Sequence, residues 1–175
     1  MKNLKLFTVF AMLLVGSIAV MAQDLGYVDP YEVISSMPEK ISADTELDNL
    51  YKKHQAEIKR QQDALTAIET EVEAKVKGKS QAEIQAMSAE IETKQQDYIA
   101  KQQALLTYQQ AAAREVSEKE AALMKPINEK AKAAIDKVAA AKGLKYVIDA
   151  SVLLYVNNGI DITPDVKKEL GITTN

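Results

Sequence analysis

The chain has 175 residues and a formal net charge of −3 at pH 7, and it contains no cysteine. This length suits one compact domain or a small body with a long appendage. The acidic balance argues against nucleic acid as a partner, because that binding rests on basic patches that release counterions, and the lack of cysteine fits an oxidising compartment in which no disulfide is used.

Residues 1–22 have the pattern of a secretory signal peptide. Lys2 and Lys5 precede an apolar run over residues 6–20, and Val20-Met21-Ala22 forms a small-residue cleavage signal. The alternative, a membrane anchor, needs about 20 apolar residues and a stop-transfer flank, and a lipoprotein signal needs a cysteine. We therefore expect a cleaved leader and a periplasmic protein. Because the two lysines leave with the leader, the mature chain has a formal charge of −5, with seven Tyr but no Phe or Trp.

The segment after the leader predicts a strand and a short helix. Residues 25–28 are an apolar run that is too brief for a helix. Asp29 and Pro30 then suit the cap and the first position of a helix, where the missing N–H of proline costs nothing. We expect this helix to end at Met37-Pro38, because the residue before a proline avoids the helical conformation.

Residues 44–124 predict an antiparallel helical hairpin. The outgoing helix is expected to open at Asp44 or Thr45 and to run to Lys77, where Gly78 breaks it. Ser80 with Glu83 forms a capping box that starts the return helix. A seven-residue apolar repeat keeps one stripe facing a partner helix and imposes a left-handed supercoil. The outgoing repeat is Tyr51, Ile58, Leu65 and Val72, and the return repeat is Ile84, Ile91, Tyr98, Leu105 and Ala112.

The apolar stripe of this hairpin is thin. The companion row on the outgoing helix includes His54, Gln61 and Lys75, and the return helix has glutamine at the companion positions 95, 102 and 109. Two such helices bury little apolar surface, and burial contributes about 25 cal/mol per Å². We expect an arm that is stable enough to form and loose enough to bend.

The return helix is expected to continue beyond the hairpin. Pro126 should kink it or restart it, since proline removes a hydrogen bond inside a helix. A helical apolar face then continues through Val138 to Gly143. Glycine at this position suits the left-handed residue that follows a helix, so we expect the helix to end there.

After Gly143 the pattern changes to that of strands. Residues 144–148 and 152–156 are rich in β-branched and aromatic side chains, and residues 149–151 suit the connection of a β-hairpin between them. Residues 157–159 are expected to form a turn. Thr163-Pro164 should then cap a last short helix.

These elements predict a mostly α fold with a small β body. The terminal strands form a sheet with two open apolar edges, which proteins resolve by pairing or closure, so we expect homo-oligomerisation. The expected divisions are the signal peptide (1–22), the body (23–43 and 125–175) and the hairpin arm (44–124). The residues expected in the oligomer body are Tyr27, Val28, Tyr146, Val147, Ile148, Leu153 and Tyr155.

Chemistry-bearing motifs are weak in this chain. Gly78-Lys79-Ser80 matches the end of a phosphate-binding loop, but position 73 is glutamate where the motif needs glycine, and it lies in a predicted helix. His54 is the single histidine and lacks cysteine partners for a metal site, so it is more simply a polar interruption of the seam. We predict no catalytic, cofactor-binding or metal-binding residue and no enzyme activity.

Two sets of arm residues have a structural and a functional interpretation. Lys75, Lys77 and Lys79 either offset the dipole at a helix end or make weak contacts with an anionic membrane surface or acidic segments. Met87, Ile91, Tyr98 and Tyr108 either pack within the arm or contact a client, since Met adapts to irregular surfaces and Tyr combines an apolar ring with a polar tip.

Several short stretches of the mature chain occur in an order and spacing typical of one family. They are Gly26-Tyr27-Val28-Asp29, Met37-Pro38-Glu39, Pro126-Ile127, Lys130, Ala134-Ile135, Val138-Ala139, residues 143–149 and residues 161–166. Through them the chain resembles the Skp/OmpH family of periplasmic chaperones over nearly its whole mature length. The resemblance implies a trimer with a small β-barrel body and three helical arms that enclose a cavity for unfolded outer-membrane proteins, without ATP. The acidic charge departs from the strongly basic surfaces of family members, and their proposed lipopolysaccharide-binding cluster has no counterpart here.

The sequence therefore predicts an ATP-independent periplasmic holdase. Its expected partners are unfolded outer-membrane proteins and further copies of itself, with no cofactor and no nucleic acid. The alternative is a non-catalytic cell-envelope scaffold whose arm docks one specific helical partner. A holdase protects unrelated unfolded chains from aggregation, whereas the scaffold has one saturable partner.

Overall fold

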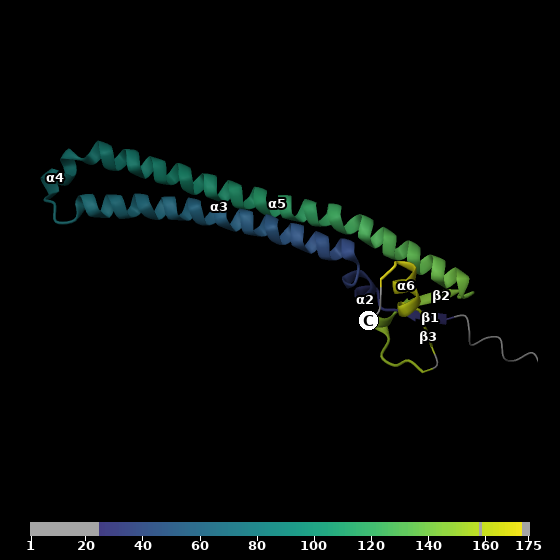
Figure 1. Cartoon of the computed structure of the whole chain (residues 1–175). Helices are drawn as coiled ribbons and strands as arrows, with labels where there is room; N and C mark the ends of the chain where they lie inside the picture. The colour runs from purple at the N-terminus through teal and green to yellow at the C-terminus, as the bar shows by residue number, and fades with distance from the viewer. Residues whose placement is uncertain (1–24, 158, 173–175) are drawn as a thin grey trace, which may run out of the picture. The chain divides into compact units, whose positions relative to one another are not determined.

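The computed structural model describes residues 25–157 and 159–172 (Figure 1). The predicted signal peptide, and Asn158 of the predicted turn, lie outside these described residues. The described chain divides into two compact units. The first contains the residues up to Ile41 and those from Lys125 onward, and the second contains Ser42–Met124. The elements in chain order are β1 (Leu25–Val28), α2 (Pro30–Ser35), α3 (Pro38–Val76), α4 (Gln81–Ala86), α5 (Ser88–Ala141), β2 (Tyr146–Asp149), the 3-10 helix η2 (Ala150–Val152), β3 (Ile160–Asp161) and α6 (Thr163–Glu169).

The sheet of the first unit has three strands in the order β2-β1-β3, and both pairings are parallel. The predicted strand at 25–28 is confirmed as the central strand. Glycine suits position 26, because a Cβ there would lie 2.6 Å from Leu144 Cδ1, at the end of a side chain, and 3.3 Å from the carbonyl oxygen of Ile160. The close approach of these two neighbouring segments of the same chain favours glycine.

The predicted β-hairpin between 144–148 and 152–156 is wrong. Only Tyr146–Asp149 forms a strand, a 3-10 helix follows it, and the third strand is Ile160–Asp161. The Asp149 side chain accepts a hydrogen bond from the backbone N–H of Ser151 at 2.8 Å, which turns the chain away from β2. Residues 152–156 have strand composition but no strand partner among the described residues, and β propensity measures fit to a packed, pleated surface.

Helix α2 begins as predicted, but the position where α3 begins was predicted wrongly. Asp29 caps α2 by accepting a hydrogen bond from the N–H of Glu32 at 2.9 Å, with Pro30 in the first turn. Pro38 does not only follow the end of α2; it also opens α3, six or seven residues before the expected start at Asp44 or Thr45. Proline favours this role because its fixed φ is already helical and its missing N–H would be unpaired there anyway.

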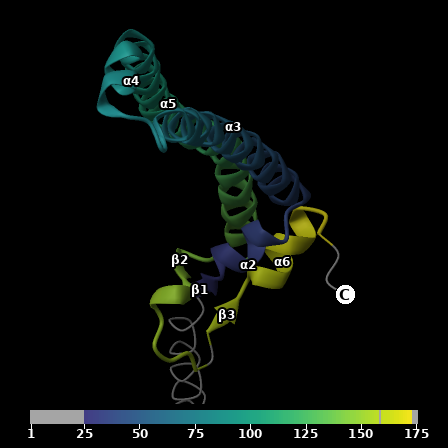
Figure 2. The ribbon, with the colours of Figure 1, turned by 90° about the vertical axis from the view of Figure 1, so that its left-hand side faces the viewer.

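Helix α6 is tied to the start of the chain. Thr163 was expected to cap it, but the cap residue is Ile162, which makes no side-chain cap. The Thr163 hydroxyl instead accepts a hydrogen bond from the N–H of Asp29 at 3.0 Å. Lys167 donates to Glu32 at 2.7 Å, so α6 lies against α2 (Figure 2). The buried apolar core of this unit contains Val28, Val33, Met37, Ile127, Ala131, Ala134, Val138, Ile162 and Val166.

Helix α5 runs without interruption from Ser88 to Ala141 with Pro126 inside it, so the predicted restart does not occur. Its end is confirmed at Gly143, which has φ +66°. The N–H of Gly143 bonds to the carbonyl of Ala140 and that of Leu144 to the carbonyl of Ala139. This pair of bonds is the Schellman motif, which satisfies the last helical carbonyls.

In the second unit, α3 and α5 run antiparallel and α4 lies at the turn between them (Figure 1). Gly78 has φ +74° in this turn. The predicted capping box is confirmed, with Ser80 N–H bonding Glu83 at 2.8 Å and Glu83 N–H bonding the Ser80 hydroxyl at 3.4 Å. A break at Met87, which separates α4 from α5, was not predicted from the sequence. Within the described residues, no helix has both the length and the apolar character of a membrane span.

Candidate functional site

The facing sides of α3 and α5 bury a narrow apolar row in the second unit. Of the predicted repeat, only Leu65, Leu105 and Ala112 are buried, whereas Tyr51 is 51% exposed. The other members of the repeat are partly buried. The buried residues of this unit that the repeat did not include are Ala43, His54, Ile68 and Val116. The seam is therefore thin, and much of the apolar surface along it stays accessible.

Ion pairs connect α3 and α5 across the hairpin. Lys94 bonds Glu71 at 2.7 Å, and Lys119 pairs with Glu46 at 2.6 Å. The Lys94 hydrogen bond lowers the pKa of the Glu71 carboxyl. These side chains are partly exposed, so each pair contributes at most about 1 kcal/mol. Sequence reasoning missed these pairs, because the seven-residue repeat concerns only the apolar positions.

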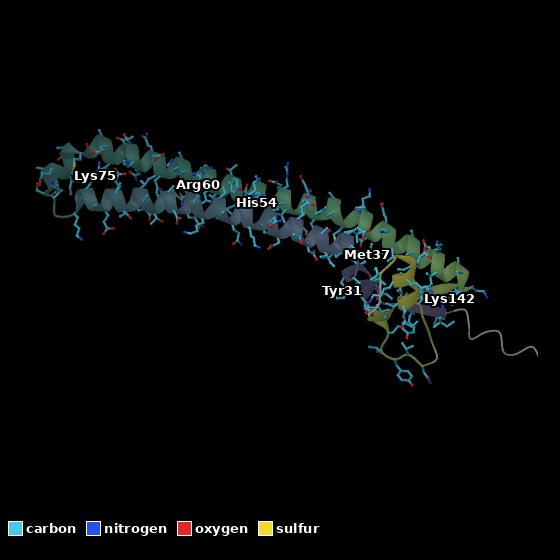
Figure 3. All side chains as sticks on the ribbon, in the orientation of Figure 1. Tyr31, Met37, His54, Arg60, Lys75 and Lys142 are labelled. Atoms are coloured by element: carbon cyan, nitrogen blue, oxygen red, sulfur yellow. The ribbon has the colours of Figure 1, made fainter. Side chains whose placement is uncertain are left out.

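His54 lies buried midway along the hairpin (Figure 3) and is 5% exposed. Its Nδ1 is 2.8 Å from the Tyr108 hydroxyl, and the two rings meet edge to face with centroids 5.7 Å apart. Its Nε2 lies 3.4 Å from a Glu115 oxygen but makes no hydrogen bond within the described residues. The structure thus places His54 as a polar member of the seam. Tyr108, a predicted client-contacting residue, is its partner across the hairpin.

An open groove of about 630 Å³ lies between α3 and α5 toward their α4 end. It brings together two of the four predicted client-contacting residues, Ile91 and Tyr98, while Met87 and Tyr108 lie outside it. Sequence reasoning missed the α3 wall, although Val72 belongs to the outgoing repeat. The residues that line the groove are Ile68, Glu69, Val72, Glu73 and Val76 from α3 and Ile91, Lys94, Gln95 and Tyr98 from α5.

The charged side chains of the groove differ in how they are satisfied. Lys94 is engaged by Glu71, as described above. Glu69 accepts a hydrogen bond from the Tyr98 hydroxyl, which raises the pKa of the Tyr98 phenol. Glu73 has no ion-pair partner among the described residues. The apolar floor is therefore bordered by two carboxylates of α3, those of Glu69 and Glu73, that have no lysine or arginine at ion-pair distance within the described residues.

The three lysines of the predicted basic tip lie around the turn. Lys75 bonds Glu90 of α5 and lies 3.6 Å from Glu71, and the Glu90 hydrogen bond raises the pKa of the Lys75 ammonium. Lys79 lies 3.4 Å from Glu83. Of the three, only Lys77 has no carboxylate partner in the described part of the chain. Two of these three positive charges are thus paired with carboxylates within the hairpin.

The first unit exposes a row of large apolar side chains. Tyr146 on the edge strand β2 is 68% exposed, Leu154 is fully exposed and Tyr155 is 80% exposed. Of the other predicted body residues, Val28 is buried in the core, and Tyr27, Val147, Ile148 and Leu153 are partly buried. Of the seven predicted body residues, Tyr146 and Tyr155 are thus the exposed ones.

The match to known proteins is specific. The sequence model of the family described as outer membrane protein (OmpH-like) matches residues 24–170. The chain belongs to the OmpH-like family. This confirms the resemblance predicted from the sequence. No functionally curated protein matches the chain significantly.

The fold is also shared with a solved structure of this family. It is the crystal structure of a protein from Caulobacter crescentus CB15 that is assigned to the OmpH-like outer membrane chaperones. The TM-score is 0.69, with 19% sequence identity over 84% of this chain and 83% of that chain. At this identity the similarity concerns the fold.

Proposed function

We propose that the chain is an ATP-independent holdase chaperone of the periplasm that binds unfolded outer-membrane proteins and prevents their aggregation. Membership of the OmpH-like family supports a chaperone role. The observation that carries the proposal is the open apolar groove on an otherwise charged helical hairpin. A shallow groove holds an unfolded segment weakly, so release needs no energy source.

In this proposal several hairpins act together. Residues 44–124 are the arm, and residues 23–43 and 125–175 are the body through which three chains associate. The exposed apolar residues of the first unit and its two edge strands, β2 and β3, support self-association. Weak contacts on several linked arms then add through effective concentration rather than through one deep pocket. The function involves binding alone, with no catalytic step.

Residues 1–22 direct the chain across the inner membrane in this proposal and are then removed.

The charge pattern of the hairpin supports a soluble, separated set of arms, because its acidic residues outnumber its basic ones and like charges repel. At the tip, Lys77 is available for a weak contact with an anionic membrane surface, which salt would screen.

The test is an aggregation assay. A denatured outer-membrane β-barrel protein is diluted into buffer with and without the purified mature chain, and light scattering is recorded. A molar excess of the chain should suppress the scattering, and unchanged scattering would refute the proposed function.

The matched control lacks residues 61–91, which removes the turn and most of the groove. We expect this variant to keep its oligomeric mass by native mass spectrometry and to lose protection. Dissociation into monomers would place assembly in the hairpin instead of the body. The alternative function, a scaffold for one helical partner, predicts no protection of the unfolded β-barrel by either protein.

A further inference from the structure

The groove on the hairpin has an apolar floor with an asymmetric charged border. Ile68 is buried in the floor, and Val72 and Val76 continue it along α3 toward the turn. Ile91 and the ring of Tyr98 form the opposite wall on α5. These five side chains form a strip that fits an apolar stretch of another polypeptide.

The two acidic residues of the border are unbalanced. Glu69 and Glu73 are exposed and lie four residues apart, one turn of helix, on the groove side of α3. Like charges at this spacing repel each other. Within the described residues neither has a lysine or arginine at ion-pair distance.

Two lysines close to the groove are already engaged by carboxylates. Lys94 lines the groove but bonds Glu71 at 2.7 Å, and Lys75 bonds Glu90. Among the residues that line the groove, a visiting acidic residue therefore finds no unpaired cation, and it meets two carboxylates. A visiting basic residue finds both carboxylates and relieves their repulsion.

From this charge complementarity we propose that the groove binds polypeptide segments in which an apolar stretch is flanked by lysine or arginine, with the basic side chain placed at Glu69 and Glu73. The inference rests on the proposed function and adds a substrate preference to it. The groove accepts apolar segments with basic flanks and excludes apolar segments with acidic flanks. Discrimination is electrostatic, whereas affinity comes from the apolar strip.

The test uses the full mature chain and three fluorescent peptides. They share one apolar core and carry lysine, serine or glutamate on both flanks, and binding is measured by fluorescence anisotropy at low and at high salt. The charge variant is E69Q/E73Q. Its matched control is E92Q/E120Q, which removes the same charge from two exposed glutamates of α5 that do not line the groove.

We expect the lysine peptide to bind most tightly and the glutamate peptide least tightly. Exposed ion pairs are weak, so E69Q/E73Q should lower the affinity for the lysine peptide by roughly three- to tenfold. The affinity for the serine peptide should stay unchanged. High salt should reduce the difference between peptides in the parent chain, because charges are screened over about 3 Å at 1 M salt. The E92Q/E120Q control should keep the original order and affinities.

The apolar part is tested separately with V76N, whose side chain lines the groove at the end of α3, and with I99N as control. Ile99 is 55% exposed and lies outside the groove. V76N should lower the affinity for all three peptides alike, and I99N should lower the affinity for none of them. Circular dichroism checks that each variant keeps its helix content.

The proposal is overturned if the three peptides bind equally, if E69Q/E73Q and E92Q/E120Q have the same effect, or if V76N changes nothing. The aggregation assay separates this outcome from failure of the proposed function. If the parent chain suppresses aggregation but shows no flank preference, the chaperone function stands and the groove assignment is wrong. If it suppresses no aggregation, the function itself fails.

Discussion

The ion pair between Lys167 and Glu32 tests what a buried lysine costs when its partner is removed. The Lys167 side chain on α6 is 11% exposed and lies 2.7 Å from Glu32 on α2, whose side chain is 54% exposed. E32Q leaves the buried ammonium with a neutral acceptor. K167M removes the charge and keeps an apolar chain of similar length. E32Q thus removes the negative charge and keeps the buried positive charge, whereas K167M removes the buried positive charge.

The expected magnitudes follow from burial. Breaking a fully buried pair from one side costs about 3–5 kcal/mol, because an uncompensated charge remains. Water reaches the Glu32 side of this pair, so we expect E32Q to cost about 1–2 kcal/mol and K167M less than about 1 kcal/mol. In a chain of this size 1 kcal/mol shifts the unfolding midpoint by about 2–4 °C. The double variant E32Q/K167M should recover most of the loss caused by E32Q.

Urea and thermal unfolding followed by circular dichroism measure these differences. The control is D136N, which breaks the Lys132–Asp136 pair, because both side chains are well exposed at 75% and 62%. Its effect should stay within about 0.5 kcal/mol. If K167M costs more than E32Q, the charge of the lysine stabilises the fold and the reasoning is wrong. If E32Q lowers the free energy of unfolding by no more than D136N does, the burial of Lys167 does not add to the cost of removing its partner.

Three further predictions concern the sheet, the seam and pH. G26V should destabilise the first unit by about 1–3 kcal/mol in urea unfolding, because its side chain has no room between β1 and its neighbours; an unchanged midpoint would contradict the close approach. Y108F should cost about 1–2 kcal/mol by the same assay, since it keeps the ring and leaves His54 Nδ1 buried without its partner; no loss would show that the bond is dispensable. The hydrogen bond from Arg60 lowers the pKa of Glu57 from 4.5 to about 2. A depressed carboxyl pKa stabilises the fold above the unfolded pKa, so hairpin helicity should decrease as the pH falls from about 4.5 toward 2. Helicity that rises over this range would refute it.

The features that local chemistry determines were predictable from the sequence. The Ser80–Glu83 capping box, the helix end at Gly143 and the Asp29 cap each depend on two or three neighbouring residues. Strand 25–28 was also predicted, because a short apolar run between turn signals has few other conformations. Family membership was predictable because the matching stretches keep their order along almost the whole chain.

The features that depend on distant residues were not predictable. Residues 152–156 have the composition of a strand, yet β3 forms from only Ile160 and Asp161, because parallel pairing with β1 requires a crossover rather than a tight turn. The α3 wall of the groove was missed for a related reason. Its position depends on which residues of α5 lie opposite, and cross-helix ion pairs help to set that register.

The way the hairpin uses its lysines determines what its groove can hold. Lys75, Lys94 and Lys119 each pair with a carboxylate of the opposite helix, so these cations align α3 with α5 instead of facing solvent freely. Glu69 and Glu73 then remain as the unbalanced charges beside the apolar strip. Family membership indicates the class of function. The pairing pattern of this particular chain makes its groove acidic, and an acidic groove selects basic-flanked segments among all the apolar ones that an unfolded protein exposes.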